Sequence, residues 1–320
     1  MTDYDSPWKE ALERYFPEFV AFFFPLVHAA IDWQRGYTFL DKELQKVVRD
    51  AKLGRRLADK LVRVFGKDGR EGWLLVHIEV QGQTDPAFGK RMYVYNYRLF
   101  DRYDRPVISL AVLCDTSPDW RPHRFGYERW GCEVSIRFPM VKLLDYRNDW
   151  SALEQSRNPF AVLVICHLKT QETADHEQDR YRWKLRLIKS LYERGYQRQD
   201  ILELFRFIDW MMQLPAALED RLWVELRVHE EAQKVTYITS VERIGIKKGI
   251  QQGVQQGLAA ERRLLLRQIQ RRFGAEVTGQ CAPLLEQIAD QHLLEEVGEV
   301  LLDNNGVGLL QFLRDKTGAT

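Results

Sequence analysis

Two segments in the first third of the chain alternate in side-chain character and are joined by a tight turn signal. The segment RLADKLVRVF (56–65) alternates after Asp59, and WLLVHIEVQGQTD (73–85) starts apolar and alternates from Val76 to Gln81. Alternation with a period of two is the pattern of a β-strand. Between the segments, GKDGREG (66–72) contains Asp-Gly, a dipeptide typical of hairpin turns. The sequence therefore predicts an antiparallel hairpin, which determines the side chains that lie opposite one another.

The second strand of this hairpin becomes polar toward its end on one face. The apolar face consists of Leu74, Val76, Ile78 and Val80. The other face starts apolar and ends polar, with Trp73, Leu75, His77, Glu79 and Gln81. A buried carboxylate costs several kcal/mol unless it is paired or bound to a cation. This face therefore predicts a charged partner or a metal ion for Glu79.

Asp59 supplies a second carboxylate to the predicted site. It is expected just before the first strand, and a tight turn at 67–70 brings it near Glu79 and Gln81 at the end of the second. Two converging carboxylates with a further polar ligand suit Mg²⁺ or Mn²⁺, which favour hard oxygen ligands and keep several waters. The hairpin therefore predicts a divalent-cation site.

Alternative roles are open for the polar residues of this face. Glu79 can instead pair with Arg63 or Lys60 across the hairpin if the face is solvated. His77 shares the face with Glu79, about 7 Å further back along the strand. It is a candidate for a catalytic role, although a lone histidine of this kind is more often a buried or bridging side chain.

Helices are predicted on both sides of the hairpin. Residues 38–51 have apolar residues at helical spacing, and Glu43 falls in the first turn, where the helix dipole favours an acid. Residues 86–104 predict a second helix, with an apolar stripe of Phe88, Met92, Tyr95 and Leu99. Lys90 and Arg91 belong to the charged residues of this helix.

Further strands and a helical half complete the predicted α/β (α+β) class. Continuous apolar runs at 106–115 and 160–168 predict strands buried on both faces, and another strand is expected near 132–138. From about residue 176 to 240 the pattern is helical. We therefore expect a sheet flanked by helices and followed by a helical C-terminal extension.

The C-terminal part has one internal regularity. Glycines recur at every fourth position: Gly245, Gly249, Gly253 and Gly257. On a helix they form one face for close helix–helix contact, which would make the chain a homo-oligomer through residues 245–258. The alternative is a flexible linker, because each glycine lowers helix propensity by roughly 1 kcal/mol relative to alanine. We expect a domain at 1–240, a glycine-rich helical linker at 241–260 and a small helical module at 261–320.

Composition narrows the class of protein. The chain has 320 residues, and its net charge of only +1 excludes binding of nucleic acid by bulk charge, so any DNA contact needs a local basic patch. Its four scattered cysteines suit a reducing compartment better than a disulfide scaffold. The N-terminal residues do not resemble a signal sequence, and no apolar stretch is long enough to span a bilayer. We expect a cytoplasmic protein without membrane contact.

The order of these segments resembles a known family. The segments DKLVRV, HIEVQGQTD and KRMYVYNYRLFDRY, followed by PVISLAVLCD, NPFAVLVICHLKT, LYERGY, FRFIDWMMQLP and VERIGIKKG, resemble the Rpn/YhgA-like transposase-associated group of the PD-(D/E)XK nuclease superfamily. The resemblance covers roughly residues 32–257. It implies a restriction-endonuclease-like mixed sheet and a metal-dependent DNA endonuclease linked to transposition or recombination.

The resemblance also assigns the site residues. Asp59 matches the aspartate of the motif, although Ala58 precedes it where the superfamily has proline. Glu79 matches the second acidic position, and Gln81 stands where the motif has lysine. Glu43 matches an acidic position that often completes the metal site. The resemblance thus implies Mg²⁺ or Mn²⁺ held by Glu43, Asp59 and Glu79, with Asp59, Glu79 and Gln81 as catalytic residues.

Because Gln81 replaces the motif lysine, another residue must supply the positive charge of the site. Neutral Gln81 can orient water or bind phosphate, but it supplies no charge. The candidates for phosphate or DNA contacts are Arg55, Arg56, Lys60, Lys90 and Arg91, and the last two could also replace the lysine. A nuclease-fold protein that binds DNA or a protein partner without cutting is the alternative function.

Overall fold

A computed structural model describes residues 7–42, 44, 56–69, 73–233, 240–288 and 290–317 of the chain. The chain divides into two compact units, Asp5–Ile238 and Thr239–Thr320, which we call the N-terminal and C-terminal units. Each unit is described by itself.

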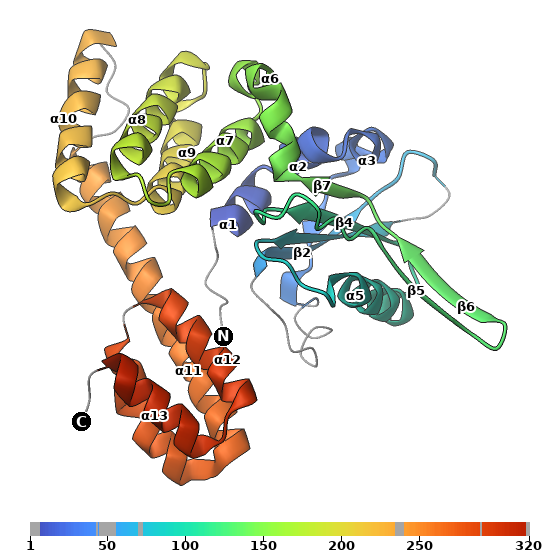
Figure 1. The fold of residues 1–320 in the computed structure, drawn as a ribbon. Coiled ribbons are helices and arrows are strands. Elements are labelled where there is room, and N and C mark those ends of the chain that lie inside the picture. Colours follow the sequence, from blue (N-terminus) through green and yellow to red (C-terminus); the bar gives the residue numbers. More distant parts are fainter. Residues whose placement is uncertain are drawn as a thin grey trace. The chain divides into compact units, whose positions relative to one another are not determined.

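The predicted hairpin forms the middle of a mixed five-stranded sheet in the N-terminal unit (Figure 1). Its strands β2 (Arg56–Val64) and β3 (Leu74–Gln81) pair antiparallel. The next strand, β4 (Val107–Leu113), runs parallel to β3, as a helical crossover connection permits. The edges are β1 (Thr38–Phe39) beside β2 and β7 (Met140–Lys142) beside β4. The mixed sheet and its helices confirm the predicted α/β class.

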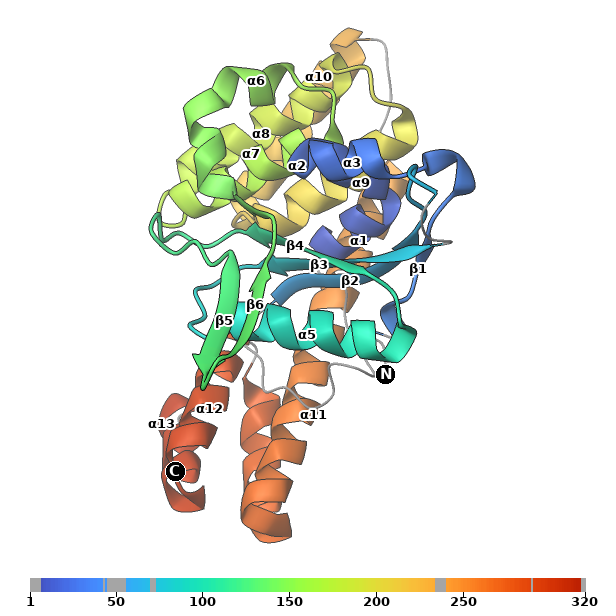
Figure 2. The ribbon, with the colours of Figure 1, turned by 90° about the vertical axis from the view of Figure 1, so that its right-hand side faces the viewer.

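Helices cover both faces of this sheet (Figure 2). One face lies against α5 (Phe88–Tyr103), and the other lies toward α1 (Pro7–Arg14), α2 (Phe16–Phe23) and α3 (Pro25–Ala30). The predicted apolar stripe of α5 is confirmed, because these side chains have no exposed surface: Phe88, Met92, Tyr95 and Leu99. The face of the hairpin that carries Glu79 and Gln81 is therefore buried beneath α5.

The start of the first hairpin strand differs from the prediction. Asp59 was expected just before the strand, whereas β2 already begins at Arg56, so Asp59 lies inside it. The pairing of β2 with β3 shifts between Arg56 and Ala58 and is regular from Ala58 onward. This regular register places Asp59 directly opposite Glu79.

The predicted strand at 160–168 is wrong, because these residues belong to the helix α7 (Pro159–Glu172). The Asn158 side chain accepts a hydrogen bond from the Phe160 backbone N–H, and Pro159 occupies the first turn. Every residue from 159 to 168 is buried, so the helix has no polar face. A helix that is buried on all sides gives the same continuous apolar run as a buried strand.

The predicted helix at 38–51 is only partly correct. Thr38 and Phe39 form β1, and residues 41, 42 and 44 are helical. Glu43 and residues 45–51 lie outside the described residues. Thr38 and Phe39 pair with Arg63 and Val62, so sheet pairing takes precedence over helical spacing at the start of this segment.

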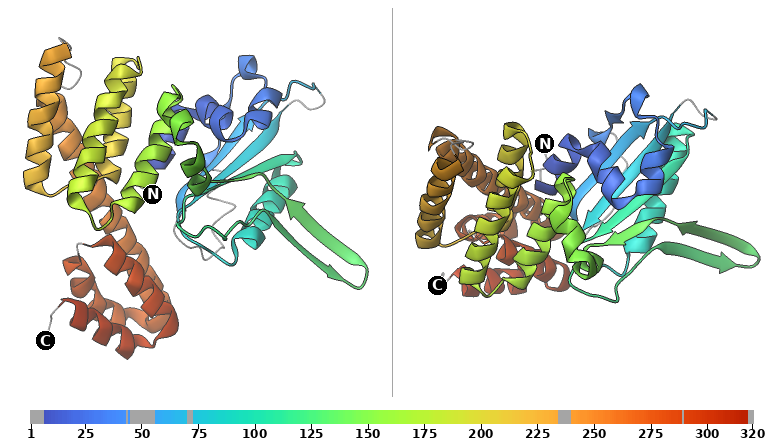
Figure 3. Two further views of the ribbon diagram at one scale, coloured as in Figure 1. Left: turned by 45° about the horizontal axis from the view of Figure 1, so that its top comes forward. Right: turned by 90° about the horizontal axis from the view of Figure 1, so that it is seen from above.

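A second hairpin extends away from the central sheet (Figure 3). It consists of β5 (Arg124–Arg129) and β6 (Cys132–Arg137), of which only the second was predicted. Trp130 and Gly131 form its turn with φ values of 53° and 80°, as hairpin turns of this length require. Trp130 is 97% exposed at this turn.

The remaining N-terminal unit is helical. The short 3₁₀ segments are η1 (Trp33–Arg35) and η2 (Leu143–Asp149). The further helices are α6 (Trp150–Gln155), α8 (Glu177–Glu193), α9 (Arg198–Met211) and α10 (Ala216–Gln233). These helices agree with the helical pattern of residues 176–240.

The C-terminal unit is built from α11 (Ser240–Gln287), α12 (Gln291–Asp303) and α13 (Gly306–Thr317). Gly274 bends α11 with φ 85° and ψ −178°, a conformation that suits glycine. The two arms of α11 and the other helices share one apolar core. The segment 241–260, predicted as a linker, is part of the first arm of α11, and its backbone is helical.

Candidate active site on the β2–β3 hairpin

Asp59 and Glu79 are brought together by the register of the central hairpin. The two residues are direct cross-strand partners in β2 and β3, so their side chains lie on one face of the sheet. Side chains in such pairs have Cβ atoms about 4.5–5.5 Å apart. Glu79 is fully buried, whereas Asp59 is half-buried. The predicted approach of these two carboxylates is confirmed.

Arg91 joins the polar residues of this face. Its Nε and Nη2 atoms lie 3.0 Å and 2.9 Å from Oε1 of Glu79. Its Nη2 atom also donates to Oε1 of Gln81 at 2.8 Å, and Nη1 forms an ion pair with Asp85. The arginine is buried at 5% exposure because it lies one turn after Phe88, on the side of α5 that faces the sheet.

This contact decides between the two alternatives for Glu79. The carboxylate pairs with Arg91, and the alternative pairing with Lys60 or Arg63 is wrong. Arg63 donates instead to Oγ1 of Thr38 at 3.2 Å. A buried carboxylate without such a partner would be strongly destabilising, so Arg91 supplies the compensating charge for Glu79 in the interior.

Gln81 is held at both ends of its amide. Its oxygen accepts from Arg91, and its Nε2 atom donates to the backbone oxygen of Gln83 at 2.9 Å. A neutral acceptor at this position matches the guanidinium of Arg91, whereas a lysine would place two cations side by side. Gln81 and Arg91 therefore form a complementary acceptor and donor on this face.

His77 occupies a buried bridging position. Its Nδ1 atom lies 3.4 Å from Oγ of Ser109, and Nε2 lies 3.6 Å from Oε2 of Glu79. The ring packs edge-on against Tyr95, and Asn96 donates to the same Ser109 hydroxyl at 3.1 Å. His77 is therefore a buried side chain next to Glu79, which agrees with the alternative to a catalytic role.

Lys60 lies on the opposite face of the sheet and does not serve as a phosphate contact in this arrangement. Its ammonium is fully buried, forms an ion pair with Glu13 of α1 and lies 2.6 Å from Oδ2 of Asp41. Asp59 and Lys60 are adjacent in β2, and adjacent strand residues point to opposite faces. This pairing with two carboxylates corrects the expected DNA contact of Lys60.

The structure describes only some of the other basic and acidic residues that were predicted for the site. Lys90 is exposed on α5, next to Arg91 but pointing outward. Arg56 belongs to β2, and its side chain lies outside the described part of the structure, as do Arg55 and Glu43 altogether. Lys90 is thus available for a phosphate contact, whereas Arg91 is committed to the buried network.

Two carboxylates are the potential ligands for a divalent ion on this face of the hairpin. Asp59 and Glu79 supply carboxylate oxygens on one face, and within the described residues no group of three His, Cys, Asp or Glu side chains could hold a metal. Mg²⁺ is usually bound by one or two carboxylates, with waters and substrate phosphates as the remaining ligands. A cation at this face would share the charge of Glu79 with Arg91.

A second buried ion pair involves Lys142 of the edge strand β7 and was not predicted. Lys142 of β7 lies 2.7 Å from both carboxylate oxygens of Asp115 and 3.0 Å from the backbone oxygen of Trp120. Gln81, Leu113 and Lys142 are successive partners across the sheet, which places Lys142 about 10 Å from Gln81. The signal in the sequence was Asp115 directly after an apolar strand.

His167 is structural. Its Nε2 atom lies 3.0 Å from the backbone oxygen of Cys114, with which it forms a buried hydrogen bond. Burial lowers the pKa of His167 to about 4, so the ring is neutral at pH 7. It therefore contributes no charge near the sheet.

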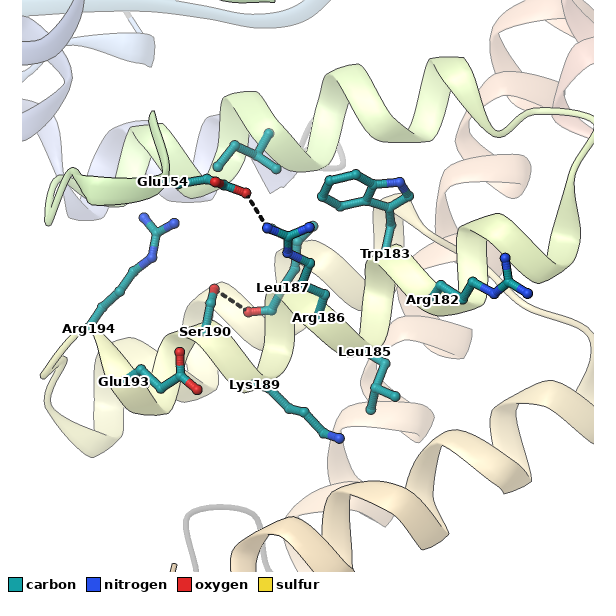
Figure 4. A pocket seen from close by; sticks show the side chains of 11 residues that line it. Glu154, Arg182, Trp183, Leu185, Arg186, Leu187, Lys189, Ser190, Glu193 and Arg194 are labelled. Atoms are coloured by element: carbon teal, nitrogen blue, oxygen red, sulfur yellow. Dashed lines mark hydrogen bonds and ion pairs between the residues drawn. The ribbon is translucent and has the colours of Figure 1, made fainter. Parts of the chain in front are cut away.

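A cavity of about 690 Å³ lies along α8, away from the hairpin (Figure 4). Several of its charged side chains are already bonded within the protein. Arg186 pairs with Glu154 at 2.7 Å, and Arg194 donates to the backbone oxygen of Ser156 at 2.8 Å. These internal contacts make it a weaker candidate for chemistry than the Asp59–Glu79 face.

Comparison of the chain with protein-family models, curated proteins and solved structures gave no match. Within the described residues, none of the helices combines the length and hydrophobicity needed to cross a bilayer. The functional conclusion therefore depends on the sequence pattern and on the geometry of the hairpin.

Proposed function

We propose that the chain is a metal-dependent DNA endonuclease that hydrolyses phosphodiester bonds at the Asp59–Glu79 face. The observation that carries this proposal is the direct cross-strand pairing of Asp59 and Glu79, with the Arg91 guanidinium bonded to Glu79 and Gln81. The order of an antiparallel hairpin, a helix and a parallel strand supports a restriction-endonuclease-like sheet. The resemblance of the sequence supports a role in transposition or recombination.

Each residue of the site has a separate role in this proposal. Asp59 and Glu79 would hold Mg²⁺ or Mn²⁺, with Glu43 as a further ligand implied by the resemblance. A bound ion would lower the pKa of a coordinated water and stabilise charge that develops on the phosphate. Arg91 is bonded to Glu79 and to the amide oxygen of Gln81, so the exposed Lys90 would provide the positive charge of the motif lysine.

The same contact favours a second candidate function. Arg91 already compensates much of the charge of Glu79, which weakens the attraction of this face for a cation. A nuclease-fold protein that binds DNA or a protein partner without cutting it agrees with this arrangement. The two candidates differ in one property, which is cleavage of DNA in the presence of a divalent ion.

Cleavage of supercoiled plasmid tests the proposal. We expect the purified full-length chain to convert supercoiled plasmid to nicked or linear form with Mg²⁺ or Mn²⁺ and to leave it intact with EDTA. Gel electrophoresis over a range of salt concentrations measures this conversion, since DNA contacts weaken with salt. Plasmid that stays supercoiled with both ions at every salt concentration would favour the non-cutting alternative.

A further inference from the structure

Residues 262–272, in the first arm of α11, contain five arginines that the structure divides into two groups. Arg262 donates to the backbone oxygen of Ile288, and Arg272 donates to that of Leu301. These two arginines connect the arm to the end of the second arm and to α12, and they help to hold the helices of the C-terminal unit together. They are therefore structural.

The other three arginines form an exposed row. Arg263, Arg267 and Arg271 follow one another at every fourth position, so they share one side of the helix at a rise of about 6 Å per step. Within the described part of the chain, no hydrogen bond or ion pair holds these guanidinium groups. The sequence also has no aspartate or glutamate three or four positions from any of them.

Such a row is unfavourable for the isolated helix. Like charges four residues apart repel one another, and here no acidic neighbour on the helix offsets the repulsion. The surrounding charges are also segregated. Residues 240–273 contain eight basic and two acidic residues, a net charge of +6, whereas residues 274–317 contain two basic and eight acidic residues, a net charge of −6. The near-neutral chain thus contains a strongly basic arm.

The surface around the row fits a polyanion better than a protein partner. Protein interfaces have an apolar centre, but Leu264 is the only large apolar side chain that is exposed in the described part of α11. Gln268 and Gln270 are also exposed beside the row and add hydrogen-bond donors. Guanidinium groups bind phosphates in bidentate geometry, and duplex DNA presents a continuous line of phosphates.

We infer that Arg263, Arg267 and Arg271 form a binding surface for the phosphate backbone of double-stranded DNA. The contacts are independent of base sequence, because they address phosphates rather than base edges. This surface lies in the C-terminal unit, whereas the Asp59–Glu79 face lies in the N-terminal unit, so it does not depend on cleavage at that face. It provides the local basic patch that a chain of net charge +1 needs for binding DNA.

The salt dependence of DNA binding tests this surface. Fluorescence anisotropy in EDTA measures the affinity of the full-length chain for a labelled duplex, so cleavage does not contribute. The variant R263Q/R267Q/R271Q is expected to lower the slope of log affinity against log salt by about 2.7, since each phosphate contact contributes about 0.9. The wild-type chain should therefore lose about 40-fold more affinity than the variant between about 50 and 200 mM salt.

A matched variant controls for the loss of charge. R182Q/R206Q/R221Q removes the same number of arginines from helices of the N-terminal unit, where each one pairs with a carboxylate on its own helix. We expect this control to keep the wild-type slope. An unchanged slope in the α11 variant, or an equal decrease in the control, overturns the inference. A lower mass in solution for the α11 variant with an unchanged DNA slope also overturns it, and would show that the row binds a second copy.

Discussion

Replacement of Asp59 by asparagine is expected to lower metal-dependent plasmid cleavage about 1,000-fold or more. The substitution keeps the shape of the side chain and removes one of the two carboxylates that would hold the cation. Metal ions supply several kcal/mol of transition-state stabilisation, and about 4 kcal/mol corresponds to a 1,000-fold change in rate. Because asparagine keeps the size of this half-buried side chain, the thermal midpoint of unfolding should change far less than the rate of cleavage.

The matched control for this variant is Asp101→Asn. Asp101 is an exposed carboxylate on α5, the helix that covers the site, and its loss removes the same charge. The control should cleave plasmid at the wild-type rate. Cleavage by Asp59→Asn at the rate of this control would show that Asp59 holds no catalytic cation.

Replacement of Arg91 by alanine is expected to give the largest loss of stability. The variant leaves Glu79 buried without its guanidinium partner and removes the donor to Gln81. Breaking a buried ion pair in this way costs about 3–5 kcal/mol, which corresponds to a fall of roughly 6–20 °C in the thermal midpoint of a domain of this size. Chemical denaturation and calorimetry measure both quantities.

A double variant separates charge from packing at this pair. Glu79→Gln combined with Arg91→Met removes both charges and should recover part of the lost stability, because a neutral pair needs no internal compensation. Lys90→Ala, at the exposed neighbouring position of α5, should change the free energy of unfolding by less than about 0.5 kcal/mol. If Arg91→Ala is as stable as Lys90→Ala, the buried network does not stabilise the fold.

The hairpin and its carboxylates were predictable because strand periodicity is a local property. The alternation of residues 76–81, the Asp-Gly turn and the position of Asp59 together determined that Asp59 lies near Glu79. The error at the start of β2 did not affect this conclusion, since Asp59 belongs to the regular part of the pairing.

Arg91 was not predicted as the partner of Glu79, although the helical pattern contained the signal that it is buried and Lys90 is not. Phe88, Met92 and Tyr95 define the buried side of α5, which includes position 91 and excludes position 90. Arg91 donates hydrogen bonds to both Glu79 and Gln81. This pair of contacts could be seen only in the tertiary structure, because it depends on how α5 lies over β3.

Two other features show where local patterns are insufficient. The run at 160–168 is apolar in both a buried strand and a buried helix, and the distinguishing signal was the cap formed by Asn158 and Pro159. The five arginines at 262–272 are alike in sequence, and only the positions of the Ile288 and Leu301 carbonyls separate the structural pair from the exposed row.

Anomalous X-ray scattering from crystals grown with Mn²⁺ and duplex DNA tests the central claim most directly. The account predicts a manganese peak between the carboxylates of Asp59 and Glu79, with the Arg91 guanidinium still beside Gln81. It also predicts that the peak disappears in crystals of Asp59→Asn. Wild-type crystals with bound DNA but no manganese at this face, and with Glu79 still bonded to Arg91, would contradict the proposed nuclease site.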